Sequence, residues 1–356
     1  MNRGLTDDEQ IKAAPRPDCA LCGSAGEFIY LGQRDRLFGA SGSWNLKRCA
    51  NRRCGLIWLD PMPLEKELGK TYGDYYTHFP RGNPVLQHAA NAGVARRIYR
   101  LVKRSYLQTR FGYELCSGRR ASSSLGRLLY LLPSQREKVD LEVRSLHAVR
   151  EGRLLDLGCG SDAWLTAMQA LGWRVEGLDA DPRAVRAAAE RGLAVRCGSL
   201  EQQHFPGETF DAVNLNNVIE HLPDPIRTLK ECVRILRPEG TLVVWTPNTA
   251  SLGHRVLKQQ WRGLEPPRHL FLFAPLSLRS LLNRAGFQRI SIQARNSRVI
   301  WQEGFRLWTH RLGANPGFGA RSATNALTFA FRLLEAGLLM VKADAGEWLD
   351  AHARKT

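Results

Sequence analysis

The sequence predicts an α/β fold with a mostly parallel sheet, preceded by a small cysteine-rich segment. Two observations predict the sheet: strand-like and helix-like patterns alternate over residues 151–295, and an apolar strand at 153–157 ends in a glycine-containing turn. A third observation concerns the N-terminal part, where four of the eight cysteines fall within residues 19–54. Of the 356 residues, 44% are apolar and 24% are charged, which is ordinary globular composition. Composition therefore excludes a wholly disordered, collagen-like or coiled-coil protein.

Composition and pattern separate five segments along the chain. They are a flexible leader at 1–17, a cysteine-rich domain at 18–61, a basic helical region at 62–150, the α/β core at 151–295, and a helical insertion with the last core strand at 296–356. No uncharged apolar stretch reaches the roughly 18 residues that a membrane-spanning helix needs. The N-terminal residues have neither the basic start nor the apolar core of a secretory signal. We therefore expect a cytoplasmic protein.

The N-terminal cysteines form two close pairs. The first pair is Cys19 and Cys22, and the second, separated from the first by 26 residues, is Cys49 and Cys54. Two such pairs on separate turns can place four thiolates tetrahedrally around one Zn²⁺. Gly23 and Gly55 follow the second cysteine of each pair, where glycine lets the backbone turn tightly. A closed four-thiolate site would be structural rather than catalytic. Four unrelated buried cysteines are the alternative, because the second pair is more widely spaced than the first.

The core elements follow in order along the chain. Strands are predicted at 153–157, 174–178, 194–197, 210–215, 241–245 and 289–293, helices at 163–171, 182–191, 225–236 and 277–285, and short strands at 27–31 and 55–59 in the cysteine-rich domain. Pro182 near a helix start and Gly286 after a helix are the usual end signals. Strands that alternate with helices imply βαβ units and a mostly parallel sheet. A last strand at 348–354 is expected to complete it.

The turn after the first core strand predicts a nucleotide-type site. The strand ends at Asp156, and Gly158 and Gly160 lead into a helix whose N-terminus favours negative charge. Twenty-three residues after Asp156 the second strand ends at Asp179, which is placed to accept hydrogen bonds from ribose hydroxyls. No third glycine stands at the dinucleotide spacing, which argues against a nicotinamide-dependent oxidoreductase. The alternative is that both aspartates are ordinary strand-end turn residues.

Residues 153–248 resemble the Rossmann-like, S-adenosylmethionine-dependent methyltransferases. Four runs carry the resemblance in order: Asp156–Asp162 for the strand-1 signature Asp-x-Gly-x-Gly-x-Gly, Phe210–Val213, Val218–Pro225 and Leu236–Leu242. The form Glu220-His221-Leu222 is similar to that of ubiquinone-biosynthesis O-methyltransferases. The wider chain resembles a bacterial subgroup with an N-terminal zinc-ribbon-like segment, in which the cysteine pairs and the run Pro266–Leu270 recur. Members of that subgroup often accompany surface-polysaccharide biosynthesis.

The resemblance implies a seven-stranded sheet with helices on both faces and S-adenosylmethionine as the cofactor. It implies these contacts: Asp156, Gly158 and Gly160 beside the methionine moiety, Asp179 on the ribose, Ala180, Ser199 and Leu200 beside the adenine, and Asn216 toward the sulfonium. Ser199 and Asn216 are as readily turn residues. Asp162 stands where the family usually has its third glycine, and its carboxylate would repel the carboxylate of the cofactor or accept from its ammonium group.

Methyl transfer to a hydroxyl needs orientation and a base, and the base is most often histidine. His221 and His269 are the candidates because both lie on loops expected at the carboxyl ends of strands, and His254 is a third. A structural role is the alternative for each, since a lone histidine is usually structural. Glu220 and His221 would also suit a divalent metal, but two adjacent ligands are too few to identify a metal site.

The expected function is O-methylation of a small molecule or glycan, including a lipid-linked saccharide. A quinone-like or aromatic metabolite is the alternative acceptor, and a zinc-dependent binding module on an inactive methyltransferase fold is the alternative class. The net charge is +17, and residues 80–150 hold 14 Lys and Arg against 4 Asp and Glu. Such a field favours an anionic partner, and the amphipathic stretch 94–110 is a candidate for the inner membrane surface. The favoured alternative for this stretch is a helical lid packed over the core with its arginines in water. A nucleic-acid partner is disfavoured, because aromatic residues are sparse there.

Overall fold

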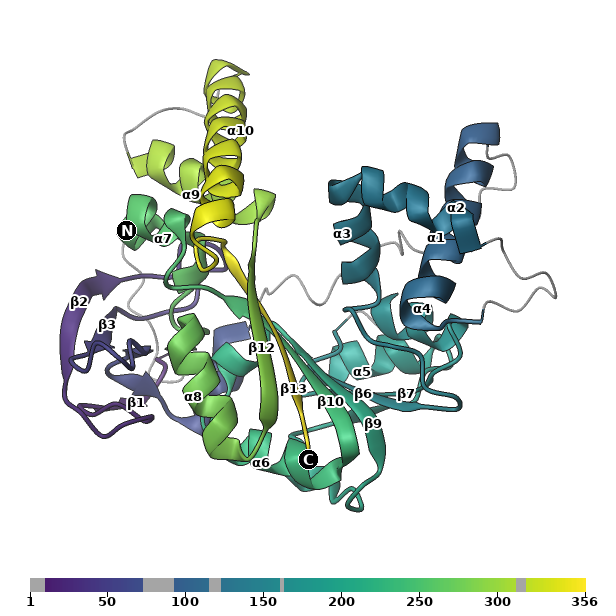
Figure 1. The fold of residues 1–356 in the computed structure, drawn as a ribbon. Helices are drawn as coiled ribbons and strands as arrows, with labels where there is room; N and C mark the ends of the chain where they lie inside the picture. Colours follow the sequence, from purple (N-terminus) through teal and green to yellow (C-terminus); the bar gives the residue numbers. More distant parts are fainter. Residues whose placement is uncertain (1–9, 73–92, 115–122, 161–162, 312–317) are drawn as a thin grey trace. The chain divides into compact units, whose positions relative to one another are not determined.

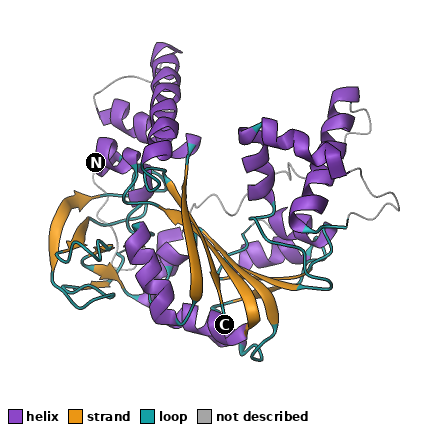
Figure 2. Cartoon of the chain, viewed as in Figure 1, coloured by secondary structure: helices purple, strands orange, loops and turns teal. Residues whose placement is uncertain are grey.

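The computed structural model describes residues 10–72, 93–114, 123–160, 163–311 and 318–356. It shows a mixed α/β chain (Figure 2). The chain divides into two compact units. The first unit comprises Met1–Tyr76, Leu215–Val233 and Val244–Thr356, and the second comprises Thr77–Asn214 and Arg234–Val243.

Seven strands form the main sheet. They are β6 (Arg153–Leu157), β7 (Arg174–Asp179), β8 (Val195–Cys197), β9 (Phe210–Asn216), β10 (Leu236–Pro247), β12 (Gln288–Arg295) and β13 (Trp348–Arg354). Their order in the sheet is β12-β13-β10-β9-β6-β7-β8. β6, β7 and β8 are parallel neighbours, whereas β12 and β13 pair antiparallel. The predicted α/β fold, the seven strands and the strand at 348–354 are confirmed.

The second unit contains the βαβ units formed by β6, β7 and β8. α4 (Ala163–Ala170) follows β6, and α5 (Pro182–Ala189) follows β7. The Asp181 side chain accepts a hydrogen bond from the Arg183 amide and Pro182 opens the helix, so α5 begins with a standard N-terminal cap. Leu154 and Leu165 are fully buried, because β6 and α4 each present an apolar side to this core.

The basic region is helical where the structure describes it. Its helices are α1 (Val94–Phe111), α2 (Ser123–Gly126), the 3-10 helix η3 (Arg127–Leu131) and α3 (Pro133–Glu142). The apolar side chains of α1 are buried only in part: Val94, Ile98 and Leu101 are 74%, 54% and 50% exposed, whereas Val102 and Tyr106 are buried. The reason is that buried side chains of α1 come from its C-terminal half, which packs on α2 and η3.

The cysteine-rich segment in the first unit forms a four-stranded sheet. Its strands are β2 (Gly26–Gln33), β3 (Trp44–Cys49), β4 (Ile57–Leu59) and β11 (Phe271–Leu272), in the order β11-β4-β3-β2. β3 and β11 were not predicted. β11 lies far along the chain from the other three, so the segment after His269 is tied by main-chain hydrogen bonding to the cysteine-rich sheet. A second small sheet pairs β1 (Ala13–Ala14) with β5 (Met62–Pro63).

Helices complete the first unit. They are η1 (Glu65–Tyr72), η5 (Ile219–His221), α6 (Pro225–Ile235), α7 (Leu252–Leu257), η6 (Lys258–Gln260), η7 (Arg262–Leu264), α8 (Pro275–Ala285), α9 (Arg298–Arg311) and α10 (Phe318–Val341). The last two residues of α6 belong to the second unit, and the short helix η4 (Glu201–Gln203) lies there as well. α9 and α10 lie side by side (Figure 1), where Trp301 stacks on Phe305 and contacts Phe331. No helix among the described residues has the length and apolar character to cross a membrane.

Candidate functional site

The four N-terminal cysteines lie together at one end of the β2–β3–β4 sheet. Their Sγ atoms all lie within 4.8 Å of one another, with 3.6 Å between Cys19 and Cys54 and 3.3 Å between Cys22 and Cys49. Four sulfurs at the usual Zn–S distance of about 2.3 Å would lie roughly 3.8 Å apart at the corners of a tetrahedron. The cluster therefore fits one tetrahedral cation.

Local backbone and electrostatics support the same interpretation. Gly23 and Gly55 have φ angles of 71° and 65°, a region that glycine enters without strain. Hydrogen bonding to Cys54 lowers the pKa of Cys19 to about 5, and the same contact raises the pKa of Cys54. Burial raises the pKa of Cys49 to about 11. Thiolates this close repel one another, so all four become ligands only with a cation among them.

The glycine turn after β6 is bound to the end of β7. Gly158 and Gly160 have φ angles of 62° and 55°, which explains why glycine stands at both positions. The Gly160 amide donates to Asp179 Oδ2 at 2.9 Å, and the Gly158 amide donates to the Leu178 carbonyl at 2.7 Å. Asp179 Oδ1 accepts from the Asp181 amide at 2.9 Å. The predicted sequence of strand, turn and acidic residue thus folds into one compact group.

Asp156 is a buried carboxylate beneath this turn. It is 4% exposed, and burial raises its pKa to about 6, against the opposing effects of Arg144 and a hydrogen bond from Asn214. The Asn214 side-chain amide donates to Asp156 Oδ1. Asn214 was not predicted, although a polar residue inside the apolar strand β9 was the available signal.

The other predicted cofactor residues are distributed over the loops that follow the strands. Ala180 and Ser199 are exposed after β7 and β8, and Leu200 is buried. Asn216 ends β9 and belongs to the first unit. Asp162 lies outside the described residues. The roles of these residues in binding a cofactor stay predictions.

His221 and His269 form a close pair in the first unit. Their ring centroids are 4.8 Å apart. His221 Nδ1 lies 3.0 Å from the Arg268 carbonyl and 3.0 Å from the Tyr72 hydroxyl, and His269 Nδ1 lies 2.7 Å from the Gly263 carbonyl. A carbonyl only accepts, so each Nδ1 carries the proton and each Nε2 keeps a lone pair. Burial lowers the pKa of His221 to about 3 and that of His269 to about 4, so both rings are neutral at pH 7.

Glu220 completes this cluster. Its side chain is fully buried, Oε2 accepts from the Thr246 hydroxyl at 2.9 Å, and Oε1 has no hydrogen-bond partner among the described residues. Burial raises its pKa to about 8. Glu220, His221 and His269 each offer one ligand atom, and these three atoms lie within 4.8 Å of one another. The fold thus adds His269 as a third ligand to the adjacent pair Glu220 and His221. One carboxylate and two imidazoles suit a divalent transition metal.

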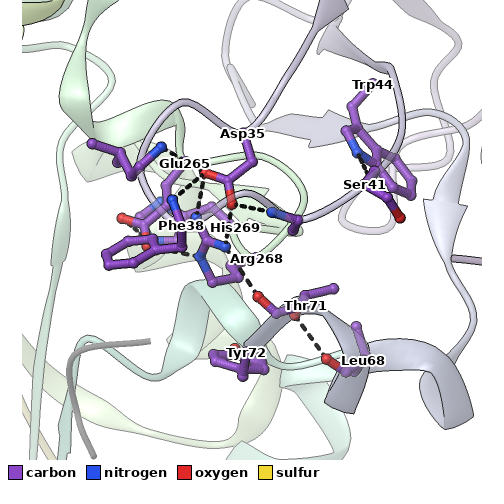
Figure 3. A network of polar contacts seen from close by, with 12 residues as sticks. Asp35, Phe38, Ser41, Trp44, Leu68, Thr71, Tyr72, Glu265, Arg268 and His269 are labelled. Atoms are coloured by element: carbon purple, nitrogen blue, oxygen red, sulfur yellow. Dashed lines mark hydrogen bonds and ion pairs between the residues drawn. The ribbon is translucent and has the colours of Figure 1, made fainter. Parts of the chain in front are cut away.

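Arg268 fixes the loop that carries His269 (Figure 3). It is 1% exposed, and its two terminal nitrogens donate to the Asp35 carboxylate at 2.8 and 2.9 Å. Its Nε donates to Glu265 at 2.9 Å, and Nη1 also donates to the Thr71 carbonyl at 3.0 Å. Burial would raise the pKa of Asp35, but the Arg268 hydrogen bonds and main-chain amides hold it below its usual value. In the sequence, Arg268 stands out only as part of the run Pro266–Leu270, and its partners could not be identified there.

His254 has both ring nitrogens occupied. Nδ1 donates to the Thr249 carbonyl at 2.7 Å, so Nε2 accepts from the Tyr30 hydroxyl at 3.0 Å. The ring is 3% exposed, and burial lowers its pKa to about 4. This third candidate base therefore has no free lone pair.

Comparisons with known proteins agree with this architecture. Residues 128–292 match the family model described as a methyltransferase domain. A ubiquinone biosynthesis O-methyltransferase of Parvibaculum lavamentivorans is 34% identical over 134 residues, which are 36% of this chain and 53% of that protein. One of Cereibacter sphaeroides is 33% identical over 150 residues, which are 39% of this chain and 61% of that protein. The chain thus spans between half and two thirds of the length of these relatives.

Among solved structures, a SAM-dependent methyltransferase from Archaeoglobus fulgidus is similar to this chain. The similarity covers 64% of this chain and 94% of that one, at 17% sequence identity and a TM-score of 0.42.

Proposed function

The chain carries a domain of the Rossmann-like, S-adenosylmethionine-dependent methyltransferase family, and we propose that it transfers a methyl group from S-adenosylmethionine to a hydroxyl of a small molecule or glycan. The observation that carries the proposal is the group made by Asp156, the two glycines with positive φ and Asp179 after β6 and β7. The bound cofactor supplies the methyl group and its own leaving group. The glycine turn leaves room for close approach by a ligand, and Asp179 offers its carboxylate to the ribose.

In this proposal the histidine pair removes the proton of the acceptor hydroxyl. His221 Nε2 and His269 Nε2 both carry a lone pair at neutral pH. Because their pKa values are low, the rings are weak bases, and their contribution depends on being held in place. Glu220, whose free Oε1 lies in the same cluster, offers a second route in which a divalent metal activates the hydroxyl.

Two acceptor classes are proposed. A glycan hydroxyl, including one on a lipid-linked saccharide, is favoured by the resemblance to the zinc-ribbon subgroup. A quinone-like or aromatic metabolite is the second candidate, because two relatives are named ubiquinone biosynthesis O-methyltransferases.

The cysteine cluster and α1 are given roles of their own in this proposal. One structural Zn²⁺ on the four clustered cysteines holds the cysteine-rich domain together. We also propose that the five segments, from the leader at 1–17 to the helical insertion with the last core strand at 296–356, are the structural divisions of the chain. Peripheral contact of α1 with an anionic membrane surface is proposed because Val94, Ile98 and Leu101 are exposed beside a series of arginines.

Two measurements test the function. Calorimetry with S-adenosylmethionine separates an enzyme from an inactive binding module, and absence of binding by the zinc-loaded protein contradicts the enzyme. A radiolabelled methyl-transfer assay on cell extract, separated into lipid, glycan, small-molecule and RNA fractions, then identifies the acceptor. Label in the glycan or lipid fraction supports the first acceptor class, label in an aromatic metabolite supports the second, and label confined to RNA contradicts both.

A further inference from the structure

A basic pocket lies in the first unit, between strands of the cysteine-rich sheet and the segment after β10. Its volume is about 570 Å³. Its lining includes Arg48 from β3, Arg255 from α7, and Lys258 directly after α7. Among the described residues that line it, none carries a carboxylate. The pocket therefore has three positive charges and no compensating acid in its wall.

The three cations have no ion-pair partner in the described parts of the chain. Arg48 faces Glu27 in the β2–β3 register, but no ion pair joins the two. All three side chains belong to exposed residues, so their charges are available to a ligand that enters from solvent. These cations lie outside residues 80–150, on which the sequence-based expectation of an anionic partner rested.

An uncharged, hydrogen-bonded pair forms part of the same wall. The Tyr30 hydroxyl donates to His254 Nε2, and His254 Nδ1 donates to the Thr249 carbonyl, so the pair holds Tyr30 and the start of α7 in place. Arg48 and Arg255 both act electrostatically on His254 and help to keep its pKa low. The imidazole thus adds no charge at pH 7, and the attraction for an anion comes from the three cations.

We propose that this pocket binds the phosphate or diphosphate group of the methyl acceptor. The inference rests on the proposed function, because it assigns a chemical class to the acceptor. Clustered Arg and Lys side chains pair with phosphate oxygens through short, charge-assisted hydrogen bonds. The pocket opens beside Thr249 and Ala250, just beyond the carboxyl end of β10, which is the strand end where α/β proteins place their ligands. The shared chemistry covers both a nucleotide-linked and a lipid-linked acceptor.

The first test measures binding of inorganic pyrophosphate by calorimetry. The probe is titrated into the wild-type chain, Arg255→Gln, Lys258→Gln and the double variant, with Lys66→Gln on η1 as a charge-matched control outside the pocket. We expect the double variant to lose about tenfold or more in affinity, since hydrogen bonds to charged groups are individually strong. The control should bind like the wild type, and melting curves establish that every variant is folded. No binding by the wild type, or equal affinity in the double variant, overturns the proposal.

The second test identifies the source of the phosphate. Bound pyrophosphate is challenged with uridine diphosphate or with vesicles that carry a polyprenyl diphosphate. Displacement by either competitor supports the proposal and names the source. If neither displaces it, the pocket is a site for the free ion only, and the proposal is overturned.

A titration with S-adenosylmethionine on the same samples separates this inference from the proposed function. The double variant should bind S-adenosylmethionine like the wild type. If the wild type binds S-adenosylmethionine but not pyrophosphate, the pocket proposal is overturned and the proposed function stands. Absence of cofactor binding by the wild type contradicts the proposed function, whatever pyrophosphate does.

Discussion

Arg268 and Asp35 are 233 positions apart in the sequence, and the guanidinium binds the carboxylate through two hydrogen bonds of 2.8 and 2.9 Å with both side chains buried. The pair ties the segment after β2 to the loop that carries His269. The Arg268 carbonyl also accepts from His221 Nδ1, so the same residue sets the tautomer of that ring. The cysteine-rich segment therefore helps to position the histidine pair.

Breaking the ion pair between Asp35 and Arg268 should lower the unfolding free energy. Asp35→Ala leaves a buried guanidinium without its main partner, and we expect a loss of about 3–5 kcal/mol in unfolding free energy. Denaturant unfolding of the variant measures it. Glu151→Ala is the control, because it removes an ion pair with Arg174 whose side chains are more than 60% exposed, and such pairs contribute less than about 1 kcal/mol. A loss as small as that of the control would contradict a stabilising role.

Removing a zinc ligand should unfold the cysteine-rich sheet. Metal analysis of purified protein should give about one zinc per chain, and Cys19→Ser or Cys54→Ser should lose it and lower the melting temperature, because binding energy of a structural metal is folding energy. Cys197→Ser is the control, since this exposed cysteine lies outside the cluster. Loss of the metal with an unchanged melting curve would rule out a structural role.

The histidine pair should affect turnover without affecting cofactor binding. His221→Ala or His269→Ala should lower turnover by about 10²–10⁴-fold if the ring accepts the proton, while affinity for S-adenosylmethionine persists. Since the pKa values are about 3 and about 4, histidine protonation should not reduce turnover as pH falls from 7 to 5. His204→Asn, at an exposed histidine, is the control. Unchanged turnover in both variants would mean that neither ring is the base.

Asp179 should determine cofactor affinity. Asp179→Ala removes the proposed acceptor for the ribose hydroxyls and the partner of the Gly160 amide. Hydrogen bonds to charged groups contribute about 1.5–3 kcal/mol, so affinity for S-adenosylmethionine should fall by about 10–100-fold. Calorimetry measures this, with the exposed Glu190→Gln as the control. An affinity equal to that of the wild type would remove Asp179 from the cofactor site.

Two buried glutamates should make stability depend on pH. Glu335 accepts from Trp301 Nε1 and from the Glu347 amide, and burial raises the pKa of Glu335 to about 8 and that of Glu347 to about 7. Unfolded glutamates ionise near pH 4.5, so between there and about pH 8 the folded chain holds more protons than the unfolded chain. The unfolding free energy should therefore fall as pH rises through this range.

Denaturant unfolding at pH 5, 6, 7 and 8 measures this dependence. Glu335→Gln cannot ionise, so its stability should fall less steeply with pH than that of the wild type, whatever its absolute stability. The exposed Glu65→Gln should keep the wild-type slope. Equal slopes for Glu335→Gln and the wild type would contradict the assignment.

Local patterns in the sequence were sufficient for the core elements. β6 begins and ends where the apolar run predicts, and α5 and α8 begin or end at Pro182 and Gly286, because helix signals act within a few residues. The four cysteines were also predictable, since the spacing within each pair limits how far apart the thiols can lie. The face of α1 was not, because which apolar side chains are buried depends on the neighbouring helices that cover them.

Contacts between distant parts of the chain were decided only by the tertiary structure. Nothing near Asp35 or Arg268 in the sequence indicates that they pair, since a buried charge takes its partner from whichever segment the fold brings against it. The contact of His269 with Glu220 and His221, and the position of Arg48 beside Arg255 in one pocket, also depend on which distant segments the fold brings together. The sequence by itself thus determined the α/β core, the glycine turn and the cysteine cluster, which depend on local spacing. The tertiary structure decided the histidine pair and the basic pocket, because each is built from segments that lie far apart in the sequence and that only long-range contacts bring together.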